Sequence, residues 1–330
     1  MKILFDMLHP AHVLKFKEVI KKLKEDGHKV IVTSRDKDVT CHLLNAFMIP
    51  HTTISKMGKG KLSLLKELIS RNLKLLKICL KEKPDVLVGF NGISIAQVGW
   101  LLRIPSVYVT DDEDAKLLTT LGIPFATKVL TEESFELSYK PKHYFIDGFF
   151  EQTYITGFIP NPSVLEDNNL KEDEPFSVVR FVAWKAIHDV GEKGLSQEYK
   201  LKLIKKLEEK GKVLVSTEET LPIEFKRYKI KSNPEKIHSL LFYASMYVGD
   251  SQAMANEAGM LGTPSIRCNT LVETIHSSGK FAAMQKLGRV YSTSNPVNAI
   301  EFALKNYGKR KPVLVNKNTI SSIINIITSI

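Results

Sequence analysis

Apolar positions in the first half of the chain follow two alternating patterns. Short apolar runs are typical of buried strands, and longer stretches with apolar residues every three to four positions are typical of helices. The pattern predicts strands at 3–5, 28–33, 51–54, 85–89 and 106–109, and helices at 13–26, 37–47, 61–82 and 93–103. Strands that alternate with helices favour a parallel, doubly wound sheet.

The same alternation restarts in the second half of the chain. It predicts strands at 176–181, 212–216, 246–249 and 263–266, and helices at 196–210, 234–244, 251–261, within 271–287, at 296–307 and at 318–329. We therefore expect an α/β fold with two Rossmann-like, doubly wound parallel-sheet domains that face a cleft. Ligands of such sheets bind beyond the carboxyl ends of the strands.

Proline, glycine and acidic residues mark the boundary between the two halves. The segment Gly157-Phe-Ile-Pro-Asn-Pro162 and the polar stretch after it have the composition of a linker. The predicted organisation has four parts: an N-terminal domain at 1–158, a linker at 159–175, a nucleotide-sugar-binding domain at 176–310, and a C-terminal segment at 311–330. The apolar helix in the last part is expected to pack back on the first domain.

Composition and charge exclude several classes of protein. The three cysteines, Cys41, Cys79 and Cys268, are far apart in sequence, which argues against a disulfide framework or a cysteine metal site. No run of about 18 apolar residues is present, so no membrane-spanning helix is predicted. The net charge of +11 suits phosphate-bearing ligands, but basic residues interleaved with stacking aromatics are lacking, so no nucleic-acid partner is expected. We expect a cytoplasmic protein.

Residues 249–273 form the most informative stretch. Gly249-Asp-Ser-Gln252 follows a strand, a helix with an internal Glu257 comes next, and Gly262-Thr-Pro264 leads into a strand that contains Arg267. The start of a helix after a parallel strand is an anion site, because free backbone N–H groups and the helix dipole point at it. Glu257 is within two turns and could accept hydrogen bonds from ribose or sugar hydroxyls. This predicts a nucleotide-sugar site.

Three sequence blocks carry a resemblance to known families. They are Asp6-Met-Leu-His-Pro-Ala-His12, Thr110-Asp-Asp-Glu-Asp-Ala115 and Ser251-Gln-Ala-Met-Ala-Asn-Glu-Ala-Gly-Met-Leu-Gly-Thr-Pro264. With the two-domain organisation, they resemble glycosyltransferases of the GT-B architecture, the UDP-N-acetylglucosamine 2-epimerases and the peptidoglycan N-acetylglucosaminyltransferase. The chain looks still more like a family of uncharacterised archaeal and bacterial proteins placed in that superfamily.

The resemblance implies a set of nucleotide-sugar contacts in the second domain. Ser251, Glu257 and Arg267 match the serine, one glutamate and the arginine of the epimerase block, whereas Gln252-Ala253 replaces its two glycines. The expected set is Arg180, Lys185, Ser216, Gly249, Ser251, Gln252, Met254, Glu257 and Arg267. For three of them there is a plainer alternative: Ser251 as a helix cap, Glu257 as a solvated glutamate and Arg267 as a surface arginine.

Candidate catalytic residues follow two strands of the first domain. His9 and His12 come after the first strand and could act as a general base or as hydrogen-bond donors; the alternative is that one caps the next helix and the other packs. Asp111 and Glu113 begin an acidic run after the strand at 106–109, and could supply a base or simply start a helix.

Two acceptor-side residues and one helix complete the predicted site. Asn91-Gly92 follows the strand that ends at Gly89 and suits close approach of an acceptor. Nine Lys or Arg and two acidic residues lie between Lys56 and Lys83, around an apolar stripe that includes Leu65, Leu68, Ile69, Leu76 and Leu80. The stripe either packs on the sheet or lies on an anionic membrane.

The combined interpretation is a glycosyltransferase that acts in polysaccharide or glycoconjugate synthesis. Its donor is expected to be a nucleoside diphosphate sugar, with UDP as the nucleotide. A UDP-sugar 2-epimerase and a non-catalytic nucleotide-sugar-binding protein are the alternatives. Basic groups on the diphosphate would make a bound metal unnecessary, so neither a metal nor a cofactor is expected. The expected partners are the nucleotide-sugar and an acceptor, with peripheral contact at the inner membrane face and a homodimer as open alternatives.

Overall fold

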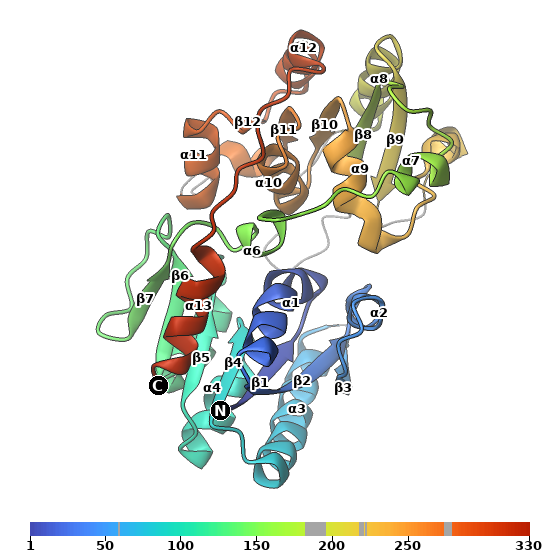
Figure 1. Cartoon of the computed structure of the whole chain (residues 1–330). Coiled ribbons are helices and arrows are strands. Elements are labelled where there is room, and N and C mark those ends of the chain that lie inside the picture. Colours follow the sequence, from blue (N-terminus) through green and yellow to red (C-terminus); the bar gives the residue numbers. More distant parts are fainter. Residues whose placement is uncertain (59, 182–195, 218–220, 222, 274–278) are drawn as a thin grey trace. The chain divides into compact units, whose positions relative to one another are not determined.

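The computed structural model describes residues 1–330 except 59, 182–195, 218–220, 222 and 274–278. The chain divides into two compact units. Unit 1 comprises residues 1–156 and 316–330, and unit 2 comprises residues 157–315 (Figure 1). Each unit is built on one parallel sheet with helices on both faces.

Unit 1 contains a seven-stranded sheet in the order β3-β2-β1-β4-β5-β6-β7, and every pairing is parallel. In that order the strands are Thr52–Lys56, Lys29–Asp36, Lys2–Met7, Val86–Phe90, Ser106–Val109, Lys128–Glu132 and His143–Ile146. The chain leaves β1 toward one side and returns at β4 on the other side. The sheet therefore has a topological switch point between β1 and β4, where such folds bind ligands.

Side chains of β1 alternate between two hydrophobic cores. Ile3 and Phe5 face a core that includes Phe16 of α1, whereas Leu4 faces a core that includes Leu75 of α3. The helices of unit 1 are α1 (Pro10–Glu25), α2 (Thr40–Ala46), α3 (Lys61–Glu82), α4 (Ile93–Leu102), α5 (Lys116–Gly122), α6 (Gln152–Ile155) and α13 (Thr319–Thr328). Successive strand residues point to opposite faces of a sheet, which explains the two cores.

The last helix of the chain, α13, belongs to unit 1. Its buried residues Ile323 and Ile327 join the same core as Phe16. The ammonium of Lys128 on β6 donates hydrogen bonds to the carbonyls of Ile326 (3.0 Å) and Ser329 (3.2 Å), which have no partner within the helix. Residues 159–175, expected to be a linker, lie in unit 2 and include the short helix α7 (Ser163–Asp167).

Unit 2 contains a five-stranded parallel sheet in the order β12-β11-β10-β8-β9. In that order the strands are Val290–Thr293, Ser265–Cys268, Met246–Gly249, Phe176–Phe181 and Lys212–Thr217; the longer helices are α8 (Gln197–Glu208), α9 (Ile237–Tyr243), α10 (Gln252–Met260), α11 (Gly279–Lys286) and α12 (Pro296–Asn306). Val179, Val248 and Ile266 pack with α8 and α12 in one core. On the opposite face, the Ser265 hydroxyl donates to the Ala255 carbonyl of α10 (2.7 Å).

The structure adds elements that the hydrophobic pattern does not predict, namely β6, β7 and β12. Strand β6 begins and ends with charged residues, Lys128 and Glu132, that are nevertheless buried. Strand β7 is an edge strand with exposed Tyr144 and Phe145, and β12 is short and half polar. None of these strands presents the continuous apolar run that marks a central strand of a parallel sheet.

Helix α3 differs from expectation in which of its faces is buried. The row that faces unit 1 is Glu67, Arg71, Leu75 and Cys79. Glu67 pairs with Arg35, and both Nη2 contacts of Arg71 to the carboxylate of Asp6 measure 2.6 Å. Three residues of the predicted stripe, Leu65, Ile69 and Leu80, are instead exposed, so their predicted packing on the sheet is wrong.

Candidate active site

The histidines after β1 occupy the start of α1. His9 is the N-cap residue, and its Nδ1 accepts a hydrogen bond from the Ala11 N–H at 3.2 Å. Pro10 follows at the first helical position, where the missing N–H costs nothing. Nδ1 of His12 accepts from the Leu8 N–H at 3.2 Å, and its ring stacks on Phe90 at 5.2 Å between centroids. One histidine thus caps and the other packs, as the plainer alternative predicted.

Both histidines are neutral at physiological pH. Burial, helped by the cations Lys37, Lys15 and Arg35, lowers the pKa of His9 to about 3. Burial also lowers the pKa of His12 well below the usual value. A base is most effective when its pKa lies near the working pH, so these rings are better suited to hydrogen bonding than to proton abstraction.

A buried ion-pair cluster lies at the same edge of the sheet. The ammonium of Lys15, in the second turn of α1, pairs with Asp111 after β5 and lies 3.7 Å from Oε1 of Glu151. It also lies 4.5 Å from the ring centroid of Phe90. Because β1 and β5 are parallel, residues beyond their carboxyl ends lie at one edge of the sheet. Asp111 lies at this edge, as predicted.

Two further carboxylates join Asp111. Oxygen atoms of Asp111, Glu132 and Glu151 all lie within 4.8 Å of one another. Glu132 ends β6, and its Oε1 accepts from the Phe150 N–H at 2.8 Å. Three carboxylates at this spacing could hold a divalent cation. The ammonium of Lys15 lies near two of them, Asp111 and Glu151, and carries one positive charge among the three carboxylates.

The other candidates near this edge have structural partners. Glu113 accepts a hydrogen bond from the Glu136 N–H at 2.6 Å. Oδ1 of Asn91 accepts from the Tyr108 hydroxyl at 3.3 Å, and Asn91 has a positive φ of 45°. A Cβ on Gly92 would come within 2.6 Å of Ile95, so the turn itself requires glycine there. Close chain packing therefore explains Gly92 without an acceptor.

In unit 2, three residues form one row across adjacent strands. Arg180 of β8 and Arg267 of β11 are both in register with Gly249 of β10, the last residue of the central strand. Residues in register in a parallel sheet point to the same face. The chain leaves β8 toward β9 on one side and returns at β10 on the other, so this row lies at the switch point of the second sheet.

Arg267 is the most unusual member of this row. Its side chain is 1% exposed, and among the described residues Nε and Nη1 have no hydrogen-bond partner. The guanidinium lies 4.3 Å from the ring centroid of Phe281, and burial lowers the pKa of Arg267 to about 10. The surface-arginine alternative is wrong. A buried cation without a carboxylate is costly unless an anion compensates it.

Helix α10 begins next to this row. The Ser251 hydroxyl accepts from the Met254 N–H at 3.4 Å, which is the plain N-cap role. Gln252, Ala253 and Met254 form the first turn, whose N–H groups have few partners inside a helix. A Cβ on Gly249 would come within 2.7 Å of the Arg180 carbonyl, so close packing between the strands requires glycine there.

Glu257 is buried, at 8% exposure, so the solvated-glutamate alternative is wrong. Its Oε1 lies 3.3 Å from Nε2 of His238, which α9 supplies. Two other polar residues are also almost fully buried: Asp250, just before the N-cap of α10, and Asn256, next to Glu257 on the helix. Unit 2 therefore buries several polar side chains at and just before α10.

The remaining predicted contacts of unit 2 are Arg180, Ser216 and Lys185. Nη1 of Arg180 donates to the Ser216 hydroxyl at 2.6 Å, across the β8–β9 pair. Lys185 lies outside the described residues. The prediction missed two residues, Glu132 and Glu151. Glu132 ends the partly polar strand β6, and Glu151 is the N-cap of the short helix α6. Nothing in the local hydrophobic pattern distinguishes either residue. His238 was likewise missed, because it lies in a predicted helix far from the motif.

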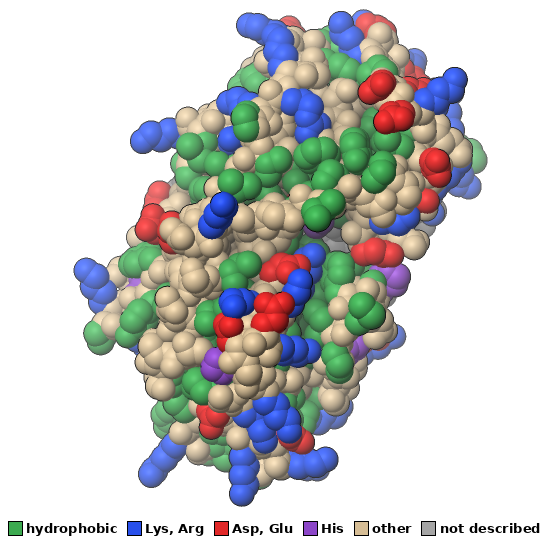
Figure 2. Space-filling view, viewed as in Figure 1, with side chains coloured by type: hydrophobic (Ala, Val, Ile, Leu, Met, Phe, Trp, Pro, Cys, Tyr) green, Lys and Arg blue, Asp and Glu red, His purple; other side chains and the backbone are tan. Residues whose placement is uncertain are grey.

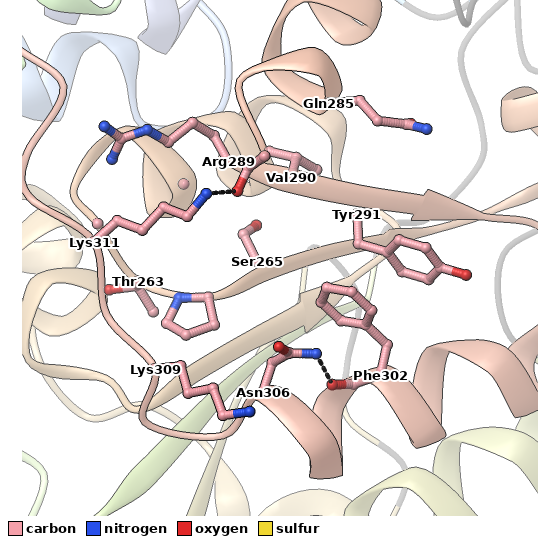
Figure 3. A pocket seen from close by; sticks show the side chains of 14 residues that line it. Thr263, Ser265, Gln285, Arg289, Val290, Tyr291, Phe302, Asn306, Lys309 and Lys311 are labelled. Carbon is pink, nitrogen blue, oxygen red and sulfur yellow. Dashed lines mark hydrogen bonds between the residues drawn. The ribbon is translucent and has the colours of Figure 1, made fainter.

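A pocket of about 200 Å³ in unit 2 lies elsewhere, at the start of β11 and β12 (Figure 3). Its walls include Arg289, Lys309 and Lys311 and the stacked rings of Tyr291 and Phe302, whose centroids are 4.1 Å apart. Lys311 donates to the Gly288 carbonyl at 2.6 Å and fastens the segment after α12 to the strand. This pocket is at the opposite end of the strands from Arg267.

Comparisons with known proteins agree with this architecture. The uncharacterized protein MJ0665 of Methanocaldococcus jannaschii is 22% identical over 321 residues, which cover 94% of this chain and 92% of that protein. The UDP-GlcNAc 2-epimerase of the same organism superposes with a TM-score of 0.69 and 16% identity over 100% of both chains. The spinosyn rhamnosyltransferase SpnG, complexed with spinosyn aglycone, gives a TM-score of 0.56 at 13% identity over 99% of this chain and 95% of that one.

These similarities confirm the fold predicted from the sequence, two parallel-sheet α/β domains of the GT-B type, and the expected resemblance to an uncharacterised family. The chain belongs to the family described as "Protein of unknown function (DUF354)", whose model matches residues 1–329.

Proposed function

We propose that the protein is an enzyme that acts on a nucleoside diphosphate sugar and transfers protons at the sugar, as an epimerase does. The observation that carries this proposal is the largely buried group of Asp111, Glu132 and Glu151 around Lys15 at the carboxyl edge of the first sheet. Several carboxylates in one buried group can divide the roles of acid and base between them. Epimerisation needs both roles, because a proton leaves one face of the sugar carbon and returns on the other.

Unit 2 supplies the features that suit a diphosphate. Arg267 is a buried cation whose Nε and Nη1 have no hydrogen-bond partner among the described residues, and the N-terminus of α10 follows the neighbouring strand. A diphosphate would compensate the guanidinium and accept hydrogen bonds from the first turn of the helix. The buried Glu257 then offers an acceptor for ribose hydroxyls. The UDP-GlcNAc 2-epimerases among the similar structures support UDP as the nucleotide.

A second candidate, glycosyl transfer, rests on a different observation. Of the three carboxylates, only Asp111 is partly exposed, with 19% of its side chain accessible, whereas Glu132 and Glu151 are almost fully buried. A transferase needs a single accessible base for an acceptor hydroxyl. Asp111 would be that base, paired with the ammonium of Lys15.

One experiment in heavy water separates the two candidates. The purified protein is incubated with UDP-sugars in D₂O, and proton NMR follows the sugar C2–H signal. Epimerisation replaces that proton with deuterium and produces a second UDP-sugar without an acceptor. Transfer leaves the C2 proton in place and releases UDP only when an acceptor is added. Glu132→Gln is the matched variant, because it keeps the shape of the side chain and removes its charge.

Calorimetric titration with UDP provides the independent readout. If UDP binds but the C2 proton is not exchanged and no UDP is released from UDP-sugars, the results would favour a non-catalytic nucleotide-sugar-binding protein. The enzyme proposal fails if neither UDP nor any UDP-sugar binds.

A further inference from the structure

Helix α3 exposes an apolar stripe along its whole length. Exposed fractions are 77% for Leu62, 54% for Leu65, 54% for Ile69, 56% for Leu73 and 58% for Leu80. These residues recur every three or four positions, apart from the gap that the half-buried Leu76 fills, so they line one side of the helix. Helix α3 therefore buries Glu67 and Arg71 together with Leu75 and Cys79, and leaves this apolar stripe exposed.

Neighbouring helices extend this apolar surface. Asn72 of α3 donates to Gln97 of α4 at 2.7 Å, and Gln97 donates to the Leu121 carbonyl of α5 at 3.1 Å, so the three helices are adjacent. Further large apolar side chains are exposed on them: Trp100, Leu101, Leu117, Leu118 and Leu121. We call this set and the stripe on α3 the α3–α5 face. Several large apolar side chains exposed on adjacent helices are typical of an interaction site.

The exposed charge on the three helices of the α3–α5 face is mainly positive. Exposed cations on the three helices are Lys66, Lys74, Lys77, Lys81, Arg103 and Lys116. Helices α4 and α5 contain no acidic residue, and α3 contains two: Glu67 is buried against Arg35, and Glu82 lies 3.9 Å from Lys2. Over α1, in contrast, both signs alternate, with pairs such as Lys22–Asp26 (Figure 2).

We propose that the α3–α5 face binds an anionic lipid bilayer. Leucines and a tryptophan would enter the interface, and the lysines beside them would meet lipid phosphates. A second copy of the chain fits this face less well. A two-fold contact would bring the same lysines together from both copies with no free carboxylate to pair them. None of the described helices is long and apolar enough to cross a bilayer, so binding would be peripheral.

The test is co-sedimentation of the full chain with vesicles. Vesicles of phosphatidylcholine alone are compared with vesicles that also contain phosphatidylglycerol. The expected result is binding to the anionic vesicles that weakens as salt is added. Lys66→Gln/Lys77→Gln/Lys81→Gln should weaken it by about fivefold for each lysine removed. Leu65→Gln/Ile69→Gln/Leu73→Gln, which changes exposed residues only, should abolish it.

A matched control removes three exposed lysines of unit 2. Lys202→Gln/Lys205→Gln/Lys210→Gln has the same change in net charge, and it should bind vesicles as the parent protein does. Equal weakening by both lysine triples would overturn the proposal, because net charge and not the face would then matter. Light scattering adds one more outcome: a dimer that Ile69→Glu dissociates would assign the face to a second copy and also overturn it.

Discussion

Arg180 and Arg267 lie in one row of the second sheet, on either side of Gly249, and point to the same face. Two guanidinium groups are thus held at the carboxyl edge with no side chain between them. The Ser216 hydroxyl accepts from Arg180, whereas Nε and Nη1 of Arg267 have no partner in the described part of the chain. A bound anion could accept hydrogen bonds from these two N–H groups of Arg267, as the proposed diphosphate site requires.

Replacing Arg267 should separate ligand binding from stability. We expect Arg267→Met to weaken UDP binding by about ten- to a hundredfold, the usual effect of losing a hydrogen bond to a charged group. The free protein should be as stable as the parent or more stable, because methionine removes an uncompensated buried cation. Calorimetric titration and thermal unfolding measure the two effects.

Arg310 offers the matched control for this prediction. Its guanidinium donates to the carbonyls of Ala244 (3.0 Å) and Leu261 (3.3 Å), so it has a structural role. Arg310→Met should lower the midpoint of unfolding and leave UDP affinity unchanged. If Arg267→Met behaves in the same way, Arg267 is structural too.

Much of this architecture could be predicted from the sequence, and the failures have physical reasons. The central strands are nearly all apolar, so β1, β4, β5 and β10 were predicted within a few residues. Glu132 was missed because its carboxylate becomes buried only when the ends of β5 and β6 meet in space. The exposed stripe of α3 was recognised as apolar, but periodicity alone does not say which face of a helix is buried when Glu67 and Arg71 find ionic partners inside.

Glu257 should affect both stability and binding, because it is buried against His238. Glu257→Ala removes the contact with the imidazole of His238 and opens a space at a buried position, so we expect a loss of about 1–3 kcal/mol in the free energy of unfolding. Glu257→Gln keeps the shape and one acceptor, so it should be close to the parent in stability. Both variants should bind UDP less tightly than the parent. Chemical denaturation and calorimetry check this, and parent-like UDP affinity in Glu257→Gln would remove the carboxylate from the nucleotide site.

The ion pair of Lys15 and Asp111 should be coupled in stability. Lys15→Met removes the cation next to the buried Glu151 and the partly buried Asp111, and we expect it to cost about 3 kcal/mol. Adding Asp111→Asn should recover part of this loss, because it removes one of those charges. Urea denaturation of the two single variants and the double variant gives the coupling energy. The double variant should remain inactive in the D₂O assay; additive single effects would mean that the contact contributes nothing.

The neutral His9 predicts an acid sensitivity that can be isolated with one substitution. Its pKa is about 3 in the folded chain, against about 6.5 when unfolded. Between these values the unfolded state binds more protons, so the stability from His9 is complete above about pH 6.5 and is lost as the pH falls. His9→Asn keeps a good N-cap acceptor and removes the titration. Relative to the parent, the variant should therefore gain about 2 kcal/mol in unfolding free energy between neutral pH and about pH 5. Urea denaturation at the two pH values measures this difference, in which His12 cancels because both proteins contain it. Parallel pH profiles for the two proteins would show that His9 is not held neutral by the fold.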